Sequence, residues 1–155
     1  MTYDVYTDGA CSVKKRFGGY AAIACFEGQQ IVLHGNKKNA TNNEMELLAV
    51  VAILHELELH IKKNDVVFIY SDSAYIVNAI NNKWIEKWMK NGWRTAENKP
   101  VKNSLLWVVL NGFISQLERS GVKCNFVKVK GHSDCKLNNY VDRLAVRETQ
   151  ILKEQ

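Results

Sequence analysis

The chain has 155 residues, 46% of them hydrophobic and 24% charged, and carries a formal net charge of +5 at pH 7. That length predicts one domain over residues 1–155, because about 150 residues bury enough surface for a single sizeable core. No apolar run approaches the roughly 20 residues that cross a bilayer, and the acidic N-terminus does not match a secretory signal, so the sequence predicts a cytoplasmic protein that binds no membrane.

Three strands are predicted at the start of the chain. Residues Thr2–Thr7 alternate polar and apolar side chains, which is typical of a half-buried strand. The apolar run Tyr20–Phe26 predicts a second, more buried strand, and the turn-like residues Glu27–Gln30 connect it to a third strand at Ile31–Gly35. Short connections between successive strands indicate an antiparallel meander.

Helices and strands then alternate along the chain. Thr41 is a favourable N-cap, and Glu44 three residues later completes a capping box for a helix that continues to Leu59. The continuous apolar run Val66–Tyr70 predicts a central strand that is buried on both faces. The remaining predicted elements are helices at Ser73–Ile80 and Ser104–Leu117, a strand at Val122–Val129 and a helix at Asn138–Leu152. This order predicts an α/β fold in which a mixed sheet is flanked by helices.

Two aspartates are expected at the carboxyl edge of the sheet. Asp8 ends the first predicted strand and is followed by Gly9, whose missing side chain lets a ligand approach the backbone. Asp72 ends the buried fourth strand. If the first and fourth strands are parallel neighbours, both carboxylates emerge at the same edge, where open α/β sheets bind ligands. Taken singly, each aspartate also fits the role of a turn or helix-capping residue.

Two further carboxylates lie on apolar helix faces. The helical stripe that contains Glu46 continues through Val50 and Ile53, and Asp142 is followed by Leu144 near the start of the last predicted helix. A buried carboxylate without a partner is costly, so it must be protonated, paired or bound to a metal. Converging carboxylates also repel one another, and hard divalent cations with oxygen ligands relieve that repulsion. The pattern therefore predicts a divalent-metal centre.

Residues 83–103 form a basic, tryptophan-rich segment. They contain six cationic and two acidic side chains, a balance of +4, together with three of the four tryptophans of the chain. Trp84 and Trp88 are four residues apart and share one helical face, with Lys87 beside them. Lysines neutralise phosphates and indoles stack on bases or sugars, so the segment predicts a nucleic-acid surface. The alternative is a solvated helix whose tryptophans only anchor it to the core.

These features together resemble ribonuclease H, type 1, of the bacterial kind. The resemblance covers about residues 4–146 in the order and spacing of that family. The stretches that carry it are Tyr6–Cys11, Thr41–Leu47, Tyr70–Ser73, Lys83–Ile85, Gly92–Thr95, Lys99–Asn103, Val129–His132 and Val141–Ala145. The resemblance implies a ribonuclease H-like fold with a five-stranded mixed sheet, and a basic protrusion at about residues 83–103.

The implied activity is hydrolysis of the RNA strand of RNA–DNA hybrids by an endonuclease that leaves 5′-phosphate and 3′-hydroxyl ends. Asp8, Glu46, Asp72 and Asp142 match the carboxylate ligands of two Mg²⁺ ions, for which Mn²⁺ is expected to substitute. One ion is expected to activate the attacking water and the other to stabilise the leaving 3′ oxygen. His132 matches a mobile proton carrier, although by itself it fits an ordinary surface histidine.

The resemblance also implies a set of substrate contacts. Cys11, Asn42 and Asn43 match residues that contact RNA, where the 2′-hydroxyl separates RNA from DNA. Thr41 and Asn103 match residues around a phosphate of the DNA strand. The remaining candidates lie in the basic protrusion and are Trp84, Lys87, Trp88, Lys90, Trp93 and Lys99.

Two departures from the family pattern concern the substrate and the acidic site. Residues Val13–Phe17 contain no glycine, asparagine or proline, so one asparagine contact to RNA is missing. The three consecutive cations Lys14, Lys15 and Arg16 offer charge to the nucleic-acid backbone instead. Asn138 and Asn139 precede Asp142 where an Asn-Glu pair is common, which removes an acidic neighbour without removing a predicted ligand.

Two other functions compete with this hypothesis. One is a module that binds hybrids without cutting them, and the presence of all four carboxylates and His132 argues against it. The other is a nuclease or strand-transfer enzyme of the same fold with a different substrate, such as a DNA integrase, and the basic protrusion with the asparagines beside Glu46 argues against that. The four scattered cysteines predict free thiols in a reducing compartment, and a monomer is expected.

Overall fold

The computed structural model describes residues 1–130 and 135–154. Its elements in chain order are β1 (Thr2–Cys11), β2 (Gly18–Phe26), β3 (Gln29–Lys37), α1 (Asn42–Leu57), β4 (Val66–Ser71), α2 (Ala74–Asn81), α3 (Trp84–Lys90), α4 (Ser104–Arg119), β5 (Lys123–Lys128) and α5 (Lys136–Lys153). No helix in these described ranges is long and apolar enough to span a membrane. The four cysteines are free thiols.

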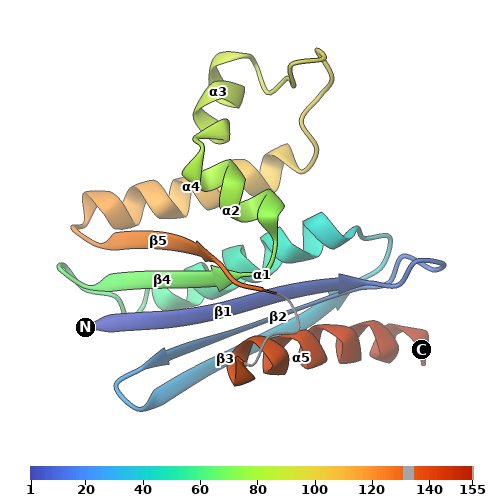
Figure 1. Cartoon of the computed structure of the whole chain (residues 1–155), viewed down its shortest axis with the longest axis horizontal. Coiled ribbons are helices and arrows are strands. Elements are labelled where there is room, and N and C mark those ends of the chain that lie inside the picture. Colours follow the sequence, from blue (N-terminus) through green and yellow to red (C-terminus); the bar gives the residue numbers. More distant parts are fainter. Residues whose placement is uncertain (131–134, 155) are drawn as a thin grey trace.

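The five strands form one mixed sheet in the order β3-β2-β1-β4-β5 (Figure 1). The pairs β3–β2 and β2–β1 are antiparallel, whereas β1–β4 and β4–β5 are parallel. The meander, the mixed sheet and the parallel pairing of the first and fourth strands are therefore confirmed. Consecutive parallel strands need a crossover between them, and α2, α3 and α4 supply it between β4 and β5. α1 connects β3 at the sheet edge to β4, which lies beyond β2 and β1.

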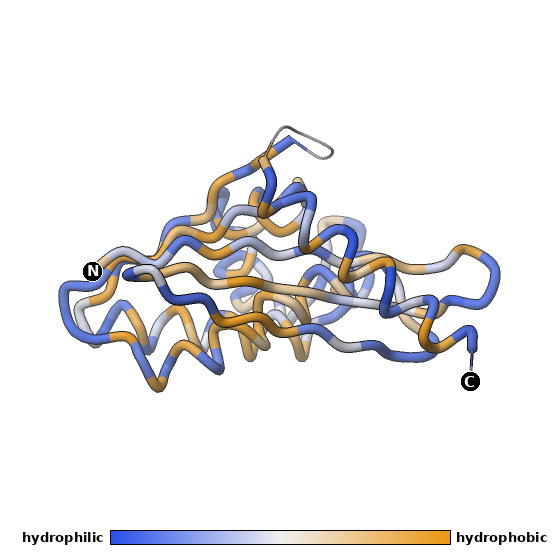
Figure 2. The backbone as a smooth tube through the Cα atoms, turned by 90° about the horizontal axis from the view of Figure 1, so that it is seen from below, coloured by the Kyte–Doolittle hydropathy of each residue, from blue (hydrophilic) through white to orange (hydrophobic). Residues whose placement is uncertain are grey.

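Helices cover both faces of this sheet. In Figure 1, α5 lies in front of the sheet and α1 passes behind it, while α4 runs alongside β5 and packs on α1. Figure 2 views the same arrangement from below and shows the sheet as a layer between helical segments. The larger core fills the side of α1 and α4, where Leu54 of α1, Ile69 of β4 and Trp107 of α4 are fully buried. A smaller core lies under α5, where Val141 and Ala145 pack on Ala21 and Ile23.

The first strand is longer than the alternation of Thr2–Thr7 predicts. β1 continues to Cys11 because β2 pairs with it along that whole length, with Asp8 opposite Ala21 and Cys11 opposite Gly18. Asp8 therefore lies inside β1, and the expectation that it ends the strand is wrong. The parallel pairing with β4 stops earlier, at Tyr6 opposite Tyr70, so Asp8 projects beyond the end of the neighbouring parallel strand.

The predicted start of α1 is confirmed. Thr41 is the N-cap, and its hydroxyl oxygen accepts a hydrogen bond from the backbone N–H of Glu44 at 3.2 Å. The Glu44 carboxylate accepts a hydrogen bond from Lys37 Nζ of β3 at 2.7 Å, so it also ties the helix to the sheet. The helix ends at Leu57, two residues before the predicted end at Leu59, which is exposed.

Candidate metal centre and nucleic-acid interface

Four elements bring the predicted carboxylates to one edge of the sheet. Asp8 lies in β1, Glu46 in the first turns of α1, Asp72 one residue after β4 and Asp142 in α5. One carboxylate oxygen from each of Asp8, Glu46 and Asp72 lies within 4.8 Å of the others. Asp142 lines the same pocket of about 440 Å³. The expected convergence of these side chains is confirmed, and we call Asp8, Glu46, Asp72 and Asp142 the carboxylate cluster.

Gly9 sets the distance between two members of the carboxylate cluster. A Cβ atom at Gly9 would lie 2.5 Å from the backbone nitrogen of Glu46 and 2.8 Å from Met45 Cβ, closer than real contacts allow. The missing side chain thus lets the first turns of α1 approach β1, which places Glu46 beside Asp8. The sequence suggested that a ligand approaches the Gly9 backbone, but the close approach in the structure is made by α1.

Asp72 reaches the cluster because its neighbour caps the next helix. Ser73 is the N-cap of α2, and its Oγ accepts a hydrogen bond from Ile76 N at 3.3 Å. The alternative in which Asp72 caps this helix is therefore wrong. β4 ends one residue earlier, at the carboxyl edge of the parallel part of the sheet, where ligands bind in open α/β sheets.

Burial and mutual repulsion raise the pKa of the two most enclosed carboxyls. Asp8 is 3% exposed, and burial, followed by the nearby Asp72 charge, raises its pKa to about 7. Burial also raises the pKa of Glu46 well above its usual range, and Asp8 adds to that shift. Glu46 Oε2 is buried and has no hydrogen-bond partner among the described residues. An unpartnered carboxylate oxygen and three repelling carboxylates form a donor set that suits hard divalent cations.

Predicted contacts to nucleic acid surround the carboxylate cluster. Cys11, Asn42 and Asn43 line the same pocket as the carboxylates. Asn43 also lines a second pocket, of about 370 Å³, with Thr41 and Asn103. The two pockets therefore adjoin at the first turn of α1, and residues about 60 positions apart in sequence meet there. His132 lies outside the described residues.

The protrusion divides its predicted contacts between two surfaces. Lys99 lines the second pocket, while Trp84 and Lys87 line another pocket of about 300 Å³; Trp88 lines both. Lys90 and Trp93 are not among the residues lining either pocket. Tyr75 and Lys102 also line the second pocket but were not among the predicted substrate contacts. Lys102 could have been predicted, because it lies within the basic stretch Lys99–Asn103.

The tryptophans of the protrusion pack on the core. The Trp88 ring centroid lies 6.2 Å from Trp84, 6.2 Å from Trp93 and 5.6 Å from Trp107 of α4. Trp107 is fully buried and donates a hydrogen bond from Nε1 to the Tyr75 hydroxyl at 3.0 Å. The anchoring role that the sequence left as an alternative is therefore present. All three protrusion tryptophans are partly exposed, so they can also contact a ligand.

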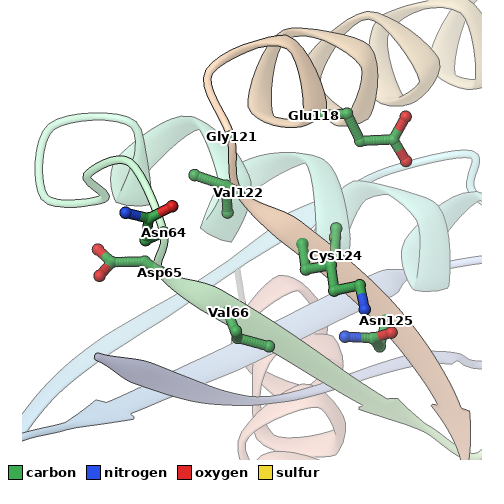
Figure 3. A pocket seen from close by; sticks show the side chains of 9 residues that line it. Asn64, Asp65, Val66, Glu118, Gly121, Val122, Cys124 and Asn125 are labelled. Carbon is green, nitrogen blue, oxygen red and sulfur yellow. The ribbon is translucent and has the colours of Figure 1, made fainter.

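Another pocket lies at the other end of the strands. It has a volume of about 600 Å³ and is formed around the start of β4 and β5, where Figure 3 shows Asp65, Glu118 and Cys124 among its lining side chains. Asp65 is engaged by the N-terminal ammonium group at 3.2 Å and by the backbone N–H of Lys62 at 2.7 Å. None of the predicted site residues that the structure describes lines this pocket, and the length of β4 separates it from Asp72.

Comparisons with known proteins agree with one another. The family model described as RNase H matches residues 2–150. Ribonuclease H of Caldicellulosiruptor saccharolyticus is 49% identical over 141 residues, which cover 91% of each chain. Ribonuclease H of Caldanaerobacter subterraneus subsp. tengcongensis is 44% identical over 146 residues, 94% of this chain and 89% of the relative. Among solved structures, LC9-RNase H1, a type 1 RNase H with the type 2 active-site motif, is similar in fold, with a TM-score of 0.75 at 22% identity over 96% of this chain and 72% of that chain.

Proposed function

The chain belongs to the ribonuclease H family, whose activity is endonucleolytic hydrolysis of the RNA strand in RNA–DNA hybrids, and we propose that its carboxylate cluster performs this reaction. The observation that carries the proposal is the convergence of Asp8, Glu46 and Asp72 within 4.8 Å, with Asp142 lining the same pocket. Four different elements supply these side chains, and a packed core alone gives no reason to gather them.

The proposed cofactor is a pair of Mg²⁺ ions, with Mn²⁺ as a substitute, held by Asp8, Glu46, Asp72 and Asp142. When bound, such ions activate the attacking water and stabilise the leaving 3′ oxygen. The unpartnered Glu46 Oε2 supports this assignment, because a buried carboxylate oxygen needs a compensating partner. His132 is proposed to carry a proton to or from the reacting groups, and the products carry 5′-phosphate and 3′-hydroxyl ends.

We assign the hybrid to a surface that crosses the two adjoining pockets. Asn42 and Asn43 stand at the rim of the carboxylate cluster, where amide groups can donate to and accept from a ribose 2′-hydroxyl. Thr41 and Asn103 line the second pocket and are proposed to hold a phosphate of the DNA strand. The charged and aromatic contacts proposed for the protrusion are Trp84, Lys87, Trp88, Lys90, Trp93 and Lys99.

Beyond the site, residues 1–155 are proposed to act as one ribonuclease H domain that is monomeric and cytoplasmic. Cys11 is proposed as an RNA contact through its backbone, because its thiol is occupied: Sγ donates to the carbonyl oxygen of Ala40 at 3.2 Å. Size-exclusion chromatography with light scattering tests the monomer directly; a stable dimer would contradict it.

One experiment tests the proposed function. End-labelled RNA–DNA hybrid, double-stranded RNA and double-stranded DNA are incubated with the protein in Mg²⁺, in Mn²⁺ and in EDTA. We expect cleavage of the RNA strand of the hybrid alone, with 3′-hydroxyl ends that a polymerase can extend. EDTA should stop the reaction, and Mg²⁺ in excess should restore it. Binding of the hybrid without cleavage would contradict the proposal, and so would cleavage of duplex DNA.

A further inference from the structure

A third pocket begins at Ser12, the residue after Cys11, which lines the carboxylate pocket. It has a volume of about 280 Å³ and is formed by the β1–β2 connection and the C-terminal end of α5. Both segments lie at the same end of the molecule in Figure 1 and again in Figure 2. Lys14, Lys15 and Lys153 line it, and no acidic side chain of residues 1–130 or 135–154 does. We call this site the lysine pocket.

The lysine pocket is built on a locked loop. Ser12 N donates to the carbonyl oxygen of Phe17 at 2.9 Å, Phe17 N donates to Ser12 Oγ at 3.1 Å, and Arg16 N donates to the carbonyl oxygen of Ser12 at 3.0 Å. Lys15 Nζ lies over the Phe17 ring, 5.9 Å from its centroid. The loop therefore presents its two lysines from a fixed backbone, which lowers the entropy that a ligand must remove.

Arg16 has a different role from the two lysines that precede it. Its Nε donates to the carbonyl oxygen of Ala40 at 3.3 Å, and its own carbonyl oxygen accepts from Ala40 N at 2.9 Å. These bonds hold the loop against the residue before the Thr41 cap. Of the three consecutive cations in the sequence, two face the lysine pocket and the third ties the loop to the start of α1.

The lysine pocket continues the surface of the carboxylate cluster. Cys11 lines the carboxylate pocket and Ser12, the next residue, lines the lysine pocket. On α5, Lys153 follows Asp142 by 11 residues, which is three helical turns, so the two side chains lie on one face about 16 Å apart along the axis. The pocket with Thr41 and Asn103 adjoins the carboxylate pocket at Asn43. In Figure 1, α3 of the protrusion lies at the top, whereas the C-terminal end of α5 lies at the lower right.

We propose that the lysine pocket binds one or two backbone phosphates of the hybrid on the side of the scissile bond opposite the protrusion. This inference rests on the proposed cleavage of hybrids. Lysines attract phosphates electrostatically without reading sequence, and the pocket is smaller than the roughly 300–1,000 Å³ clefts that enclose small molecules. At about 3.4 Å of axis for each phosphate of a strand, the distance from Asp142 to Lys153 corresponds to about three to five nucleotides.

The test replaces the three lysines by glutamine, as Lys14→Gln, Lys15→Gln and Lys153→Gln in one protein. The matched control carries Lys62→Gln, Lys63→Gln and Lys123→Gln, which remove the same charge from exposed side chains at the other end of the strands (Figure 3 shows the pocket there). Hybrid affinity is measured in EDTA at several salt concentrations. The slope of log affinity against log salt should flatten by about 0.7–1.8 in the test variant, since each phosphate contact contributes about 0.7–0.9. The control should keep the wild-type slope.

A second readout uses hybrids of increasing length. Wild-type affinity should keep rising until the hybrid reaches the lysine pocket, whereas the test variant should reach its plateau about three to five base pairs earlier. Equal slopes or equal plateau lengths in test and control variants would overturn the inference. If the triple variant no longer unfolds cooperatively, the test uses Lys153→Gln alone, an exposed change in the last turn of α5. This variant should flatten the slope of log affinity against log salt in the same direction but by less. An unchanged slope would overturn the inference.

The two proposals fail in different ways. A wild-type protein that does not cleave hybrid overturns the proposed function and the lysine pocket with it. A wild-type protein that cleaves hybrid, with a test variant that matches the control, overturns the lysine pocket alone.

Discussion

Members of the carboxylate cluster differ in burial, so they differ in how much their charges destabilise the metal-free protein. Asp8 and Glu46 are buried, whereas Asp72 and Asp142 are half-buried. Burial is the main cause of the raised pKa values of the Asp8 and Glu46 carboxyls. A neutral replacement at this site should therefore improve the stability of the metal-free protein while removing a ligand for the metal.

Asp8→Asn and Asp72→Asn should each abolish cleavage of hybrid. Loss of a metal ligand removes several kcal/mol of transition-state stabilisation, so a rate loss of about 10³-fold or more is expected. Both variants should unfold at or above the wild-type temperature in EDTA, because each change relieves carboxylate repulsion. Glu118→Gln, at an exposed carboxylate beside the distant pocket, is the matched control and should keep full turnover. Near-normal turnover in either aspartate variant would show that the site is misassigned.

His132→Ala should slow the reaction without weakening binding. A proton carrier assists the chemical step, and such groups contribute typically 10²–10⁴-fold, so turnover should fall by roughly 10²-fold. The Michaelis constant for hybrid should stay close to that of the wild type. Steady-state kinetics on a labelled hybrid separate the two effects. Normal turnover with a greatly raised Michaelis constant would mean that His132 positions the substrate instead.

Between elements, the contact of β1 with α1 decides whether the carboxylates meet. The first turns of α1 approach the β1 backbone at Gly9, where any side chain would collide with Met45 and with the Glu46 backbone. The N-cap at Thr41 fixes the residue at which α1 begins. Gly9, which has no side chain, thus affects both the stability of the fold and the position of the metal ligand Glu46.

Gly9→Ala should damage both the fold and the site. Overpacking of a tight contact costs typically 1–3 kcal/mol, and the displaced α1 would carry Glu46 away from Asp8. We expect a lower midpoint in urea and a higher Mg²⁺ concentration for half-maximal activity. Gly112→Ala in α4 is the matched control: its added Cβ meets no atom within 4 Å, so it should stabilise the helix by about 0.5–1 kcal/mol and leave the Mg²⁺ dependence unchanged. Equal behaviour of the two variants would contradict this account of Gly9.

For the molecule as a whole, the carboxylate cluster should make stability depend on pH. Asp8 has a pKa of about 7 in the folded metal-free protein, against an ordinary value of 3.8. Between these values the folded state holds the proton more tightly than the unfolded state. Stabilisation from this group is thus fully present below about pH 4 and is lost as pH rises towards 7, by on the order of 2–4 kcal/mol.

Urea unfolding in EDTA at pH 5.5 and pH 8 checks this dependence. The wild type should be less stable at pH 8, and Asp8→Asn should lose most of the difference because it removes the titrating group. Added Mg²⁺ should raise stability more at pH 8 than at pH 5.5, since the cation binds the ionised carboxylates. The same pH dependence in wild type and Asp8→Asn would assign the effect to other groups.

Local patterns were sufficient for much of the fold and for the identity of the carboxylate cluster. The Thr41 cap and a strand that begins at Val66 depend on residues close in sequence, and the structure has both, although Phe68 and Tyr70 on one face of that strand are only half-buried, so the expectation of burial on both faces is wrong. The structure also brings Asp8, Glu46 and Asp72 together, and Asp142 lines the same pocket. Hydrophobic periodicity and capping chemistry act over a few residues, so they can be read before the chain folds.

Tertiary structure alone decided the features that depend on partners distant in sequence. β1 extends through Asp8 because β2 pairs with it to Cys11, and no local alternation marks that extension. Trp88 packs against Trp107, and Lys153 of α5 joins Lys14 across more than 130 residues, because the sheet and its covering helices bring those segments together. Contacts of this kind are stabilised only after long loops close, so the energy that determines them belongs to the assembled core and not to any short stretch of sequence.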